Sequence, residues 1–267
     1  IMQAELRKWR STFEVSWTNH LAYRLNFILL VFGPALVFFF IKYNVWKSIY
    51  SMPGITVLQG YDFDQMLQYQ LLVLIVSLMA QGHNSMKLAD DIRLGRISSY
   101  LIYPFSFFKF HTASFLAFQG IQVLICGFTI CFLMITPLVT FSDFNSVLRG
   151  LFFASLVSFL WFQLQFLVGL LAFWLEETWI LRVILQTTAQ FLSGAILPLE
   201  FYPEMFVKFL DYTPFPYLTY IPIKIFQGDS INLFNASLIL LFWSLLVYAI
   251  NHLLFKRGVR LYTAAGM

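Results

Sequence analysis

The stretch KLADDIRLGRISSYLIYPFSFFK, residues 87–109, separates two long apolar segments and concentrates much of the charge of the chain. Only 11% of all residues are charged, yet five charged side chains fall between Lys87 and Arg96. Burying unpaired charge in lipid is costly, so we expect this block to lie at a membrane surface. The pattern predicts a membrane subunit with a short polar element on which a soluble partner can push.

The composition is that of a membrane protein. Hydrophobic residues make up 60% of the 267-residue chain, 32 residues are Phe, and the mean hydropathy is +0.75. A soluble core of this length cannot bury so much apolar surface, so lipid must cover most of it. We predict an all-α, polytopic membrane protein in which residues 1–267 form a single transmembrane domain.

Six apolar runs are long enough to cross a bilayer, for which a helix needs roughly 20 apolar residues. They cover approximately residues 21–42, 66–86, 112–137, 148–174, 179–199 and 232–255. An even number of spans places both termini on the same side of the membrane.

The distribution of Lys and Arg predicts which side that is. Twelve of the 17 basic residues fall on the side of the termini: Arg7, Lys8, Arg10, Arg24, Lys87, Arg93, Arg96, Lys109, Arg182, Lys256, Arg257 and Arg260. The other five are Lys42, Lys47, Arg149, Lys208 and Lys224. The positive-inside rule therefore predicts a cell (inner) membrane protein with both termini and residues 87–109 in the cytoplasm. The net charge of +4 is then an orientation signal, and we expect no nucleic-acid partner.

The first twenty residues form an amphipathic pattern rather than an apolar signal core, which argues against a cleaved secretory peptide. Leu6, Trp9, Phe13 and Trp17 recur at helical spacing, with charged residues on the other faces. Such a helix lies in the membrane interface with its indoles at headgroup depth. It serves as a simple anchor or as a lever packed against a partner, and the two roles are compatible.

Prolines interrupt the apolar segment that follows the fifth predicted span. Proline ends helices, and broken backbone at membrane depth requires protein or water to satisfy its polar groups. We predict that residues 198–228 form short helices that re-enter the outer leaflet, the alternative being an amphipathic surface hairpin. The residues expected to form this extracytoplasmic gate are Pro198, Leu199, Pro203, Pro214 and Pro216.

Motifs for catalysis and metal binding are missing. No Lys follows a Gly, so the chain has no phosphate-binding loop of the G-x-x-x-x-G-K-[ST] kind. The histidines are scattered without ligand spacing, and no Ser has a matching His and Asp arrangement. We expect no catalytic residue, no metal site and no cofactor on this chain.

The interiors of the predicted spans hold amides and aromatic rings but almost no ionisable groups, which ion-coupled carriers normally need. Most amides are expected to bond between helices. As a set, amides and aromatic rings suit an amphiphilic or cationic organic molecule, or a lipid-like compound, better than an inorganic ion. The candidates for lining such a pathway are Gln119, Gln163, Gln186 and Gln190.

Four stretches of the chain carry a family resemblance. They are LGRISSYLIYPFS (94–106), FLSGAILPLEFYP (191–203), TPFPYLTYIPIKIFQG (213–228) and FKRGVRLYTAAG (255–266). Together with the predicted topology, they resemble the permease subunit of type-2 ABC exporters over nearly the whole chain. Tyr103 stands where that family often has Arg before the motif proline.

The resemblance implies a mechanism. Permeases of this family pair as dimers, identical or of two related chains, and each docks a separate ATPase subunit that binds ATP and Mg²⁺. The docking element would be a short coupling helix made of Asp90, Asp91, Ile92, Arg93, Leu94, Gly95 and Arg96. The alternative for this block is a solvated loop that obeys the positive-inside rule. Two other functions remain as alternatives: an ion-coupled secondary transporter and a membrane-embedded lipid-modifying enzyme.

Overall fold

A computed structural model describes residues 2–22, 24–80, 84–102, 106–135 and 139–261 of the chain. Over these ranges the fold is all-α, and extended pairing is limited to one bridge between Leu58 and Tyr61. The α-helices are α1 (Met2–Ala22), α2 (Arg24–Tyr50), α3 (Phe63–Ala80), α4 (Asn84–Arg93), α5 (Ile97–Ile102), α6 (Phe107–Ile135), α7 (Phe144–Leu170), α8 (Trp179–Leu192), α9 (Glu204–Leu210), α10 (Phe215–Leu218), α11 (Tyr220–Gln227) and α12 (Leu233–Leu261). Two 3₁₀ turns, η1 (Leu171–Phe173) and η2 (Leu199–Phe201), complete the set.

Four helical stretches in the described part of the chain are long and apolar enough to cross a membrane. They are Phe63–Ala80, Phe107–Ile135, Phe144–Phe173 and Leu233–Leu261. Helix α2, of 27 residues, covers most of the first predicted span. Four of the six predicted spans thus correspond to helices of sufficient length and hydropathy, and the count of six stays a prediction.

The fifth predicted span is shorter than the sequence pattern suggests. Helix α8 ends at Leu192 rather than at 199, and its 14 residues rise only about 21 Å. Gly194, with a φ of +81°, turns the chain out of the helix, and Pro198 prevents the helix from resuming. The following residues form short helices instead, as the proline spacing predicts.

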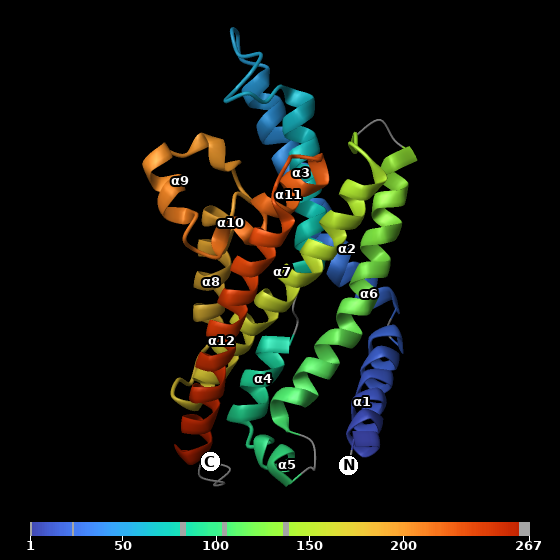
Figure 1. Cartoon of the computed structure of the whole chain (residues 1–267), viewed down its shortest axis with the longest axis vertical. Coiled ribbons are helices and arrows are strands. Elements are labelled where there is room, and N and C mark those ends of the chain that lie inside the picture. The colour runs from blue at the N-terminus through green and yellow to red at the C-terminus, as the bar shows by residue number, and fades with distance from the viewer. Residues whose placement is uncertain (1, 23, 81–83, 103–105, 136–138, 262–267) are drawn as a thin grey trace.

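Helix α7 is the centre of the bundle and packs against α3, α4, α6, α11 and α12 (Figure 1). Its contact with α11 depends on Gly150, where an added Cβ would lie 2.5 Å from Cδ1 of Phe226. Helix α12 is joined to α7 by Asn251, whose side-chain amide donates to the carbonyl oxygen of Gln163 at 3.0 Å. Close approach through small residues and side-chain amides is the usual packing mode of helices in lipid.

The two ends of the bundle differ in character. The start of α1, the pair α4–α5 and the end of α12 lie together at one end, which is the lower end in Figure 1. The connection between α2 and α3, and helices α9 and α11, lie toward the opposite end. The charged block of residues 87–96 is thus on the same end as both terminal helices, an arrangement that agrees with the grouping of basic residues in the sequence.

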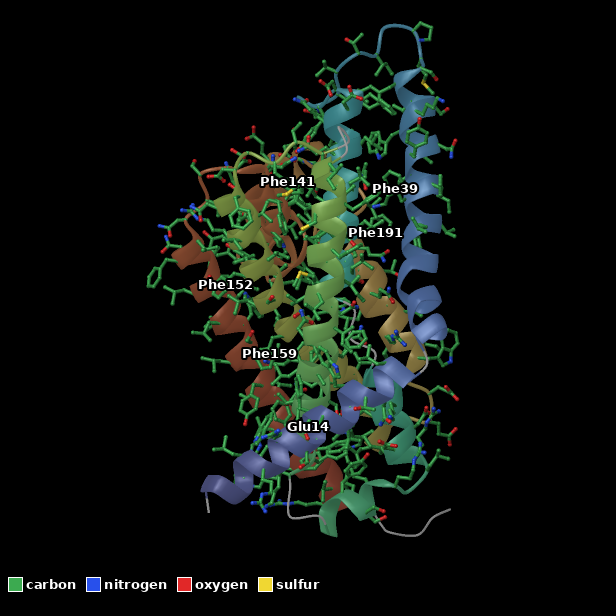
Figure 2. All side chains as sticks on the ribbon, turned by 90° about the vertical axis from the view of Figure 1, so that its right-hand side faces the viewer. Glu14, Phe39, Phe141, Phe152, Phe159 and Phe191 are labelled. Carbon is green, nitrogen blue, oxygen red and sulfur yellow. The ribbon has the colours of Figure 1, made fainter. Side chains whose placement is uncertain are left out.

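Helix α1 runs beside the first half of α6. It crosses the lower end of the bundle at an angle to α2 (Figure 2). Lys109 pairs with Glu5 at 3.0 Å, and an added Cβ on Gly120 would lie 2.9 Å from Cζ3 of Trp17. Leu6 is 61% exposed, so it remains available to lipid or to a partner. The helix is therefore both fixed to α6 and open on its outer face. Of the predicted interfacial residues, Trp9 and Trp17 are half-buried and Phe13 is exposed.

Candidate functional site

The charged element between α3 and α6 is an amphipathic helix followed by a tight turn. Leu88, Ala89 and Ile92 are at most 4% exposed and belong to the face of α4 that packs against α7 and η1. The charged side chains of Lys87 and Arg93 lie on the exposed face. This division explains why the segment is helical and why it lies flush against the bundle rather than as a free loop.

Arg93 connects this helix to the segment that precedes α8. Its guanidinium lies 2.7 Å from Oδ1 of Asp90 and 3.4 Å from Oε1 of Glu177, and it donates to the carbonyl oxygen of Glu176 at 2.8 Å. The hydrogen bond with Asp90, aided by the charge of Glu177, raises the pKa of Arg93. Arg93 therefore links α4 to the segment that leads into α8.

The predicted coupling residues do not all have the same environment. The helix covers Asn84–Arg93, whereas Leu94, Gly95 and Arg96 form the turn to α5, where Gly95 has a φ of +75° that favours glycine. Leu94 is 67% exposed at this turn, an unusual position for a large apolar side chain among charged residues.

Asp91, in contrast, is 3% exposed and points into the protein. It pairs with Nε of Arg96 at 3.0 Å and accepts a hydrogen bond from the hydroxyl of Tyr100 at 3.3 Å. Burial raises the pKa of Asp91, although the charge of Arg96 opposes the shift. Asp91 therefore stabilises the turn, and among the predicted coupling residues the charges that face outward are those of Asp90, Arg93 and Arg96.

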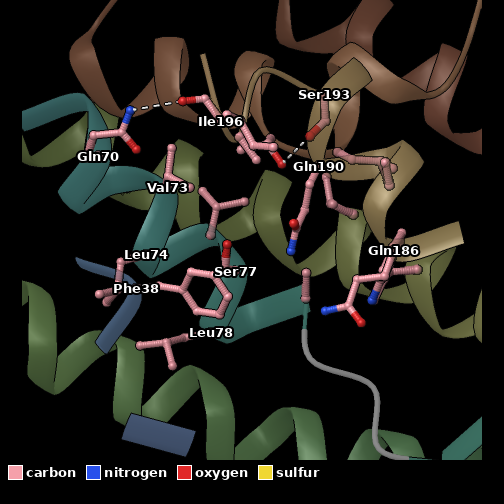
Figure 3. Close-up of a pocket in the computed structure, with 18 of the residues that line it drawn as sticks. Phe38, Gln70, Val73, Leu74, Ser77, Leu78, Gln186, Gln190, Ser193 and Ile196 are labelled. Carbon is pink, nitrogen blue, oxygen red and sulfur yellow. Dashed lines mark hydrogen bonds between the residues drawn. The ribbon is translucent and has the colours of Figure 1, made fainter. Parts of the chain in front are cut away.

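A second candidate site is a pocket of about 440 Å³ between α2 and α3 on one side and α8 on the other. Figure 3 shows Gln186 and Gln190 of α8 opposite Val73, Leu74 and Ser77 of α3. The pocket has the volume typical of small-molecule sites, which is roughly 300–1,000 Å³. Its walls are mainly apolar, with a few polar groups.

One end of the pocket is markedly polar. Lys42 of α2 donates hydrogen bonds to Oε1 of Gln70 at 2.7 Å and to the carbonyl oxygen of Ala195 at 2.6 Å. Ser193, also in the wall, donates to the hydroxyl of Thr219 at 3.0 Å. The polar end thus lies where the broken segment after α8 meets α2 and α3.

The four predicted pathway residues fall into two groups. Gln186 and Gln190 line the pocket. Gln119 and Gln163 do not line it; they are buried, at 7% and 1% exposure, in α6 and α7. Lys42 was not predicted as a site residue, because a Lys at the end of an apolar run also fits a simple orientation signal.

A polar cluster closes the end of the bundle that carries α9 and α11. The ammonium of Lys224 lies 3.0 Å from Oε1 of Glu200 and 3.6 Å from Oδ2 of Asp229. The hydroxyls of Tyr61 and Tyr220 donate to the same Glu200 oxygen at 3.0 and 2.7 Å. Although burial acts to raise it, the bonds from Tyr220, the backbone and Lys224 bring the pKa of Glu200 below its ordinary value.

The predicted gate residues differ in exposure. Pro198, Leu199 and Pro216 are buried, Pro214 is half-buried, and Pro203 is exposed at the start of α9. Tyr69 of α3 holds the same segment by donating to the carbonyl oxygen of Gly194 at 2.7 Å. The segment is therefore packed onto the bundle through both apolar and polar contacts.

Within the described residues there is no group of three His, Cys, Asp or Glu side chains that could hold a metal ion.

The apolar helical bundle and its charged end agree with the comparison to known protein families. Residues 33–266 match the family described as ABC-2 family transporter protein, so the chain belongs to this family. It is a multi-pass membrane protein and an ABC transporter permease, a membrane component rather than a catalytic one. The match favours neither an ion-coupled carrier nor a lipid-modifying enzyme. A comparison with curated proteins found no match.

Proposed function

We propose that the chain is the transmembrane subunit of an ATP-driven exporter and that a separate ATPase subunit, which binds ATP and Mg²⁺, drives it. The observation that carries this proposal is the outer surface of α4 and its turn, where Arg93, Leu94 and Arg96 are exposed and Asp90 is half-buried. Leu94 is an apolar side chain surrounded by charges of both signs, which is suited to a groove on a soluble partner. The apolar contact contributes affinity, and the charges fix how the two proteins align.

Contacts inside the chain support a route from this surface to the pocket. The buried face of α4 packs on α7, and Arg93 contacts Glu176 and Glu177 just before α8 begins. The far half of α8 supplies Gln186 and Gln190 to the pocket wall. A push on α4 would therefore displace α8 relative to α3 and change the shape of the pocket.

The orientation is part of the same proposal. The end of the bundle with α1, α4 and α5 faces the cytoplasm, where the ATPase subunit lies. The end with the Glu200 cluster faces outward. The bias of basic residues supports this orientation. In this arrangement residues 198–228 dip into the outer leaflet and act as the extracytoplasmic gate over the pocket.

A second permease copy, identical or related, completes the pathway. Helix α8 supports this assignment because Ala189 is the one buried residue among its 14 residues. Trp179, Ile184 and Phe191 on this helix are each at least 50% exposed. A partner permease covering α8 would enclose the pocket between two subunits. The mixed apolar and amide lining supports an amphiphilic organic substrate.

Reversal of the exposed charges on α4 tests the proposal. The complex with the co-expressed ABC ATPase is reconstituted in vesicles, and ATP-driven transport is measured for Asp90→Lys, Arg93→Glu and Arg96→Glu together. Arg149→Glu and Lys208→Glu, which are exposed residues of the opposite end, are the matched controls. We expect loss of ATPase binding and transport in the α4 variant only. Equal coupling in all three proteins would refute the assignment.

A further inference from the structure

We propose that the pocket between α2, α3 and α8 binds an amphiphile with an acidic headgroup, and that Lys42 binds that headgroup. The inference rests on the proposed function, since it names the class of molecule that the exporter carries. It begins from the pairing of Lys42, which is a cation in the wall of a largely apolar cavity.

The ammonium of Lys42 lacks a counter-charge. Its two hydrogen-bond acceptors, the side-chain oxygen of Gln70 and the carbonyl oxygen of Ala195, are neutral. No carboxylate among the described residues lies within the 4.0 Å ion-pair distance of its Nζ. A charge removed from water without a partner is costly, so an anion at this position would be stabilised strongly.

The geometry leaves room for that anion. An ammonium carries three donor hydrogens, and Gln70 and Ala195 account for two of them. Gln70 and Ala195 line the pocket beside Lys42 and are themselves buried, at 2% and 8% exposure. The remaining donor is available to a headgroup in the pocket. The two hydrogen bonds that Lys42 donates fix the position of the cation, so the site is preorganised for an anion.

The rest of the pocket suits an apolar tail. Phe38 lies one helical turn from Lys42 on the same face of α2, and Leu74 and Leu78 continue the wall along α3. From Gln70 to Ala80 the wall follows α3 for about 15 Å. A molecule with one acidic end and a medium-length hydrocarbon or aromatic body would therefore place its charge at Lys42 and its body toward Leu78.

The side chains of Gln186 and Gln190 add polar groups beside this path. Neither amide has a hydrogen-bond partner among the described residues. They are able to bond to ester, amide or hydroxyl groups of the bound molecule. A cationic headgroup, which the sequence left open, is disfavoured because it would meet the ammonium of Lys42 at the polar end.

Binding to the purified full chain in lipid nanodiscs, without ATPase or ATP, tests the inference. The probe is radiolabelled dodecanoate, and the competitors are dodecyl phosphate, dodecanol, dodecyltrimethylammonium and inorganic phosphate. We expect dodecanoate and dodecyl phosphate to bind roughly tenfold or more tightly than dodecanol. Inorganic phosphate, which has no tail, should compete poorly, and this arm separates an amphiphile site from a simple anion site.

The variants locate the headgroup. Lys42→Met should lower dodecanoate affinity by roughly tenfold while leaving dodecanol affinity unchanged. Lys47→Met, an exposed Lys farther along the same helix, should change neither. If dodecyltrimethylammonium binds wild type as tightly as dodecanoate, the inference is wrong even if Lys42→Met does not fold. The same holds if folded Lys42→Met keeps full dodecanoate affinity.

The outcome is separable from that of the exporter proposal. Failure of headgroup selectivity with intact ATP-driven transport would overturn only the substrate class. Loss of ATP coupling in wild type with intact dodecanoate binding would overturn the exporter proposal and leave the pocket chemistry standing.

Discussion

The ammonium of Lys224 on α11 lies 3.0 Å from the carboxylate of Glu200 in η2, and both side chains are less than one-third exposed. Two tyrosine hydroxyls donate to the same carboxylate oxygen, so the pair is the centre of a network that joins the segment after α8 to the connection before α3. If this segment is the gate, the network is the contact that must break for the gate to move.

Removal of one partner of this ion pair should destabilise the folded protein. We expect Lys224→Met to lower the free energy of unfolding by about 1–3 kcal/mol, because it leaves a partly buried carboxylate without its cation. Lys224→Met with Glu200→Gln should lose less than the sum of the two single changes. Denaturant unfolding of the purified protein measures both effects, and strict additivity would show that the pair does not act as a unit.

The same pair predicts a dependence on pH. The pKa of Glu200 is below its ordinary value of 4.5 in the folded protein. Its contribution to stability is therefore complete above pH 4.5 and is lost as the pH falls through the lower, folded pKa. Thermal unfolding between neutral pH and pH values below 4.5 should show a smaller acid-induced loss in Glu200→Gln. The exposed Glu204→Gln should behave as wild type, and identical profiles in all three proteins would contradict the prediction.

Packing between α7 and α11 predicts a contrast between two glycines. Gly150→Ala places a methyl group 2.5 Å from the fully buried ring of Phe226 and should cost about 1–3 kcal/mol of stability. Gly127→Ala in α6 meets no atom within 4 Å and should be neutral or stabilising by up to about 1 kcal/mol. Unfolding midpoints of the two variants check this, and equal midpoints would show that α11 can shift freely on α7.

In the proposed mechanism, transmission from α4 to α8 depends on the contact of Arg93 with the segment before α8. Glu177→Arg should reduce transport per ATP hydrolysed by roughly two- to fivefold, the size expected for an exposed ion pair. Glu176→Arg is the matched control, because Glu176 contacts Arg93 through its backbone oxygen. Transport and ATP hydrolysis are measured in the same vesicles. A loss of equal size in both variants would point to charge alone rather than to this contact.

The general architecture was predictable because hydropathy and charge act over many residues. Long apolar runs predict the main helices, and a concentrated block of charge predicts a polar element outside the lipid. The proline spacing also predicts short helices after residue 198. These signals are local, so tertiary contacts do not have to be known.

The details of the site depend on contacts between distant segments and were not predictable in the same way. Asp91 reads as one of several surface charges, but the structure buries it against Arg96. Lys42 reads as an orientation marker and is found in the pocket wall through bonds to residues in α3 and after α8. A spacing pattern shows which face of a helix a residue occupies. It does not show which other segment of the chain packs against that face.

The most direct test of the central claim is photo-crosslinking from position 94. A benzoylphenylalanine residue replaces exposed Leu94 at the α4 turn or, as a control, exposed Met205 of α9 at the opposite end of the bundle. The full chain is co-expressed with its ABC ATPase and irradiated in membranes, and adducts are identified by mass spectrometry. We predict an ATPase adduct from position 94 and none from position 205. Absence of the adduct at 94, or equal adducts at both positions, would contradict the account.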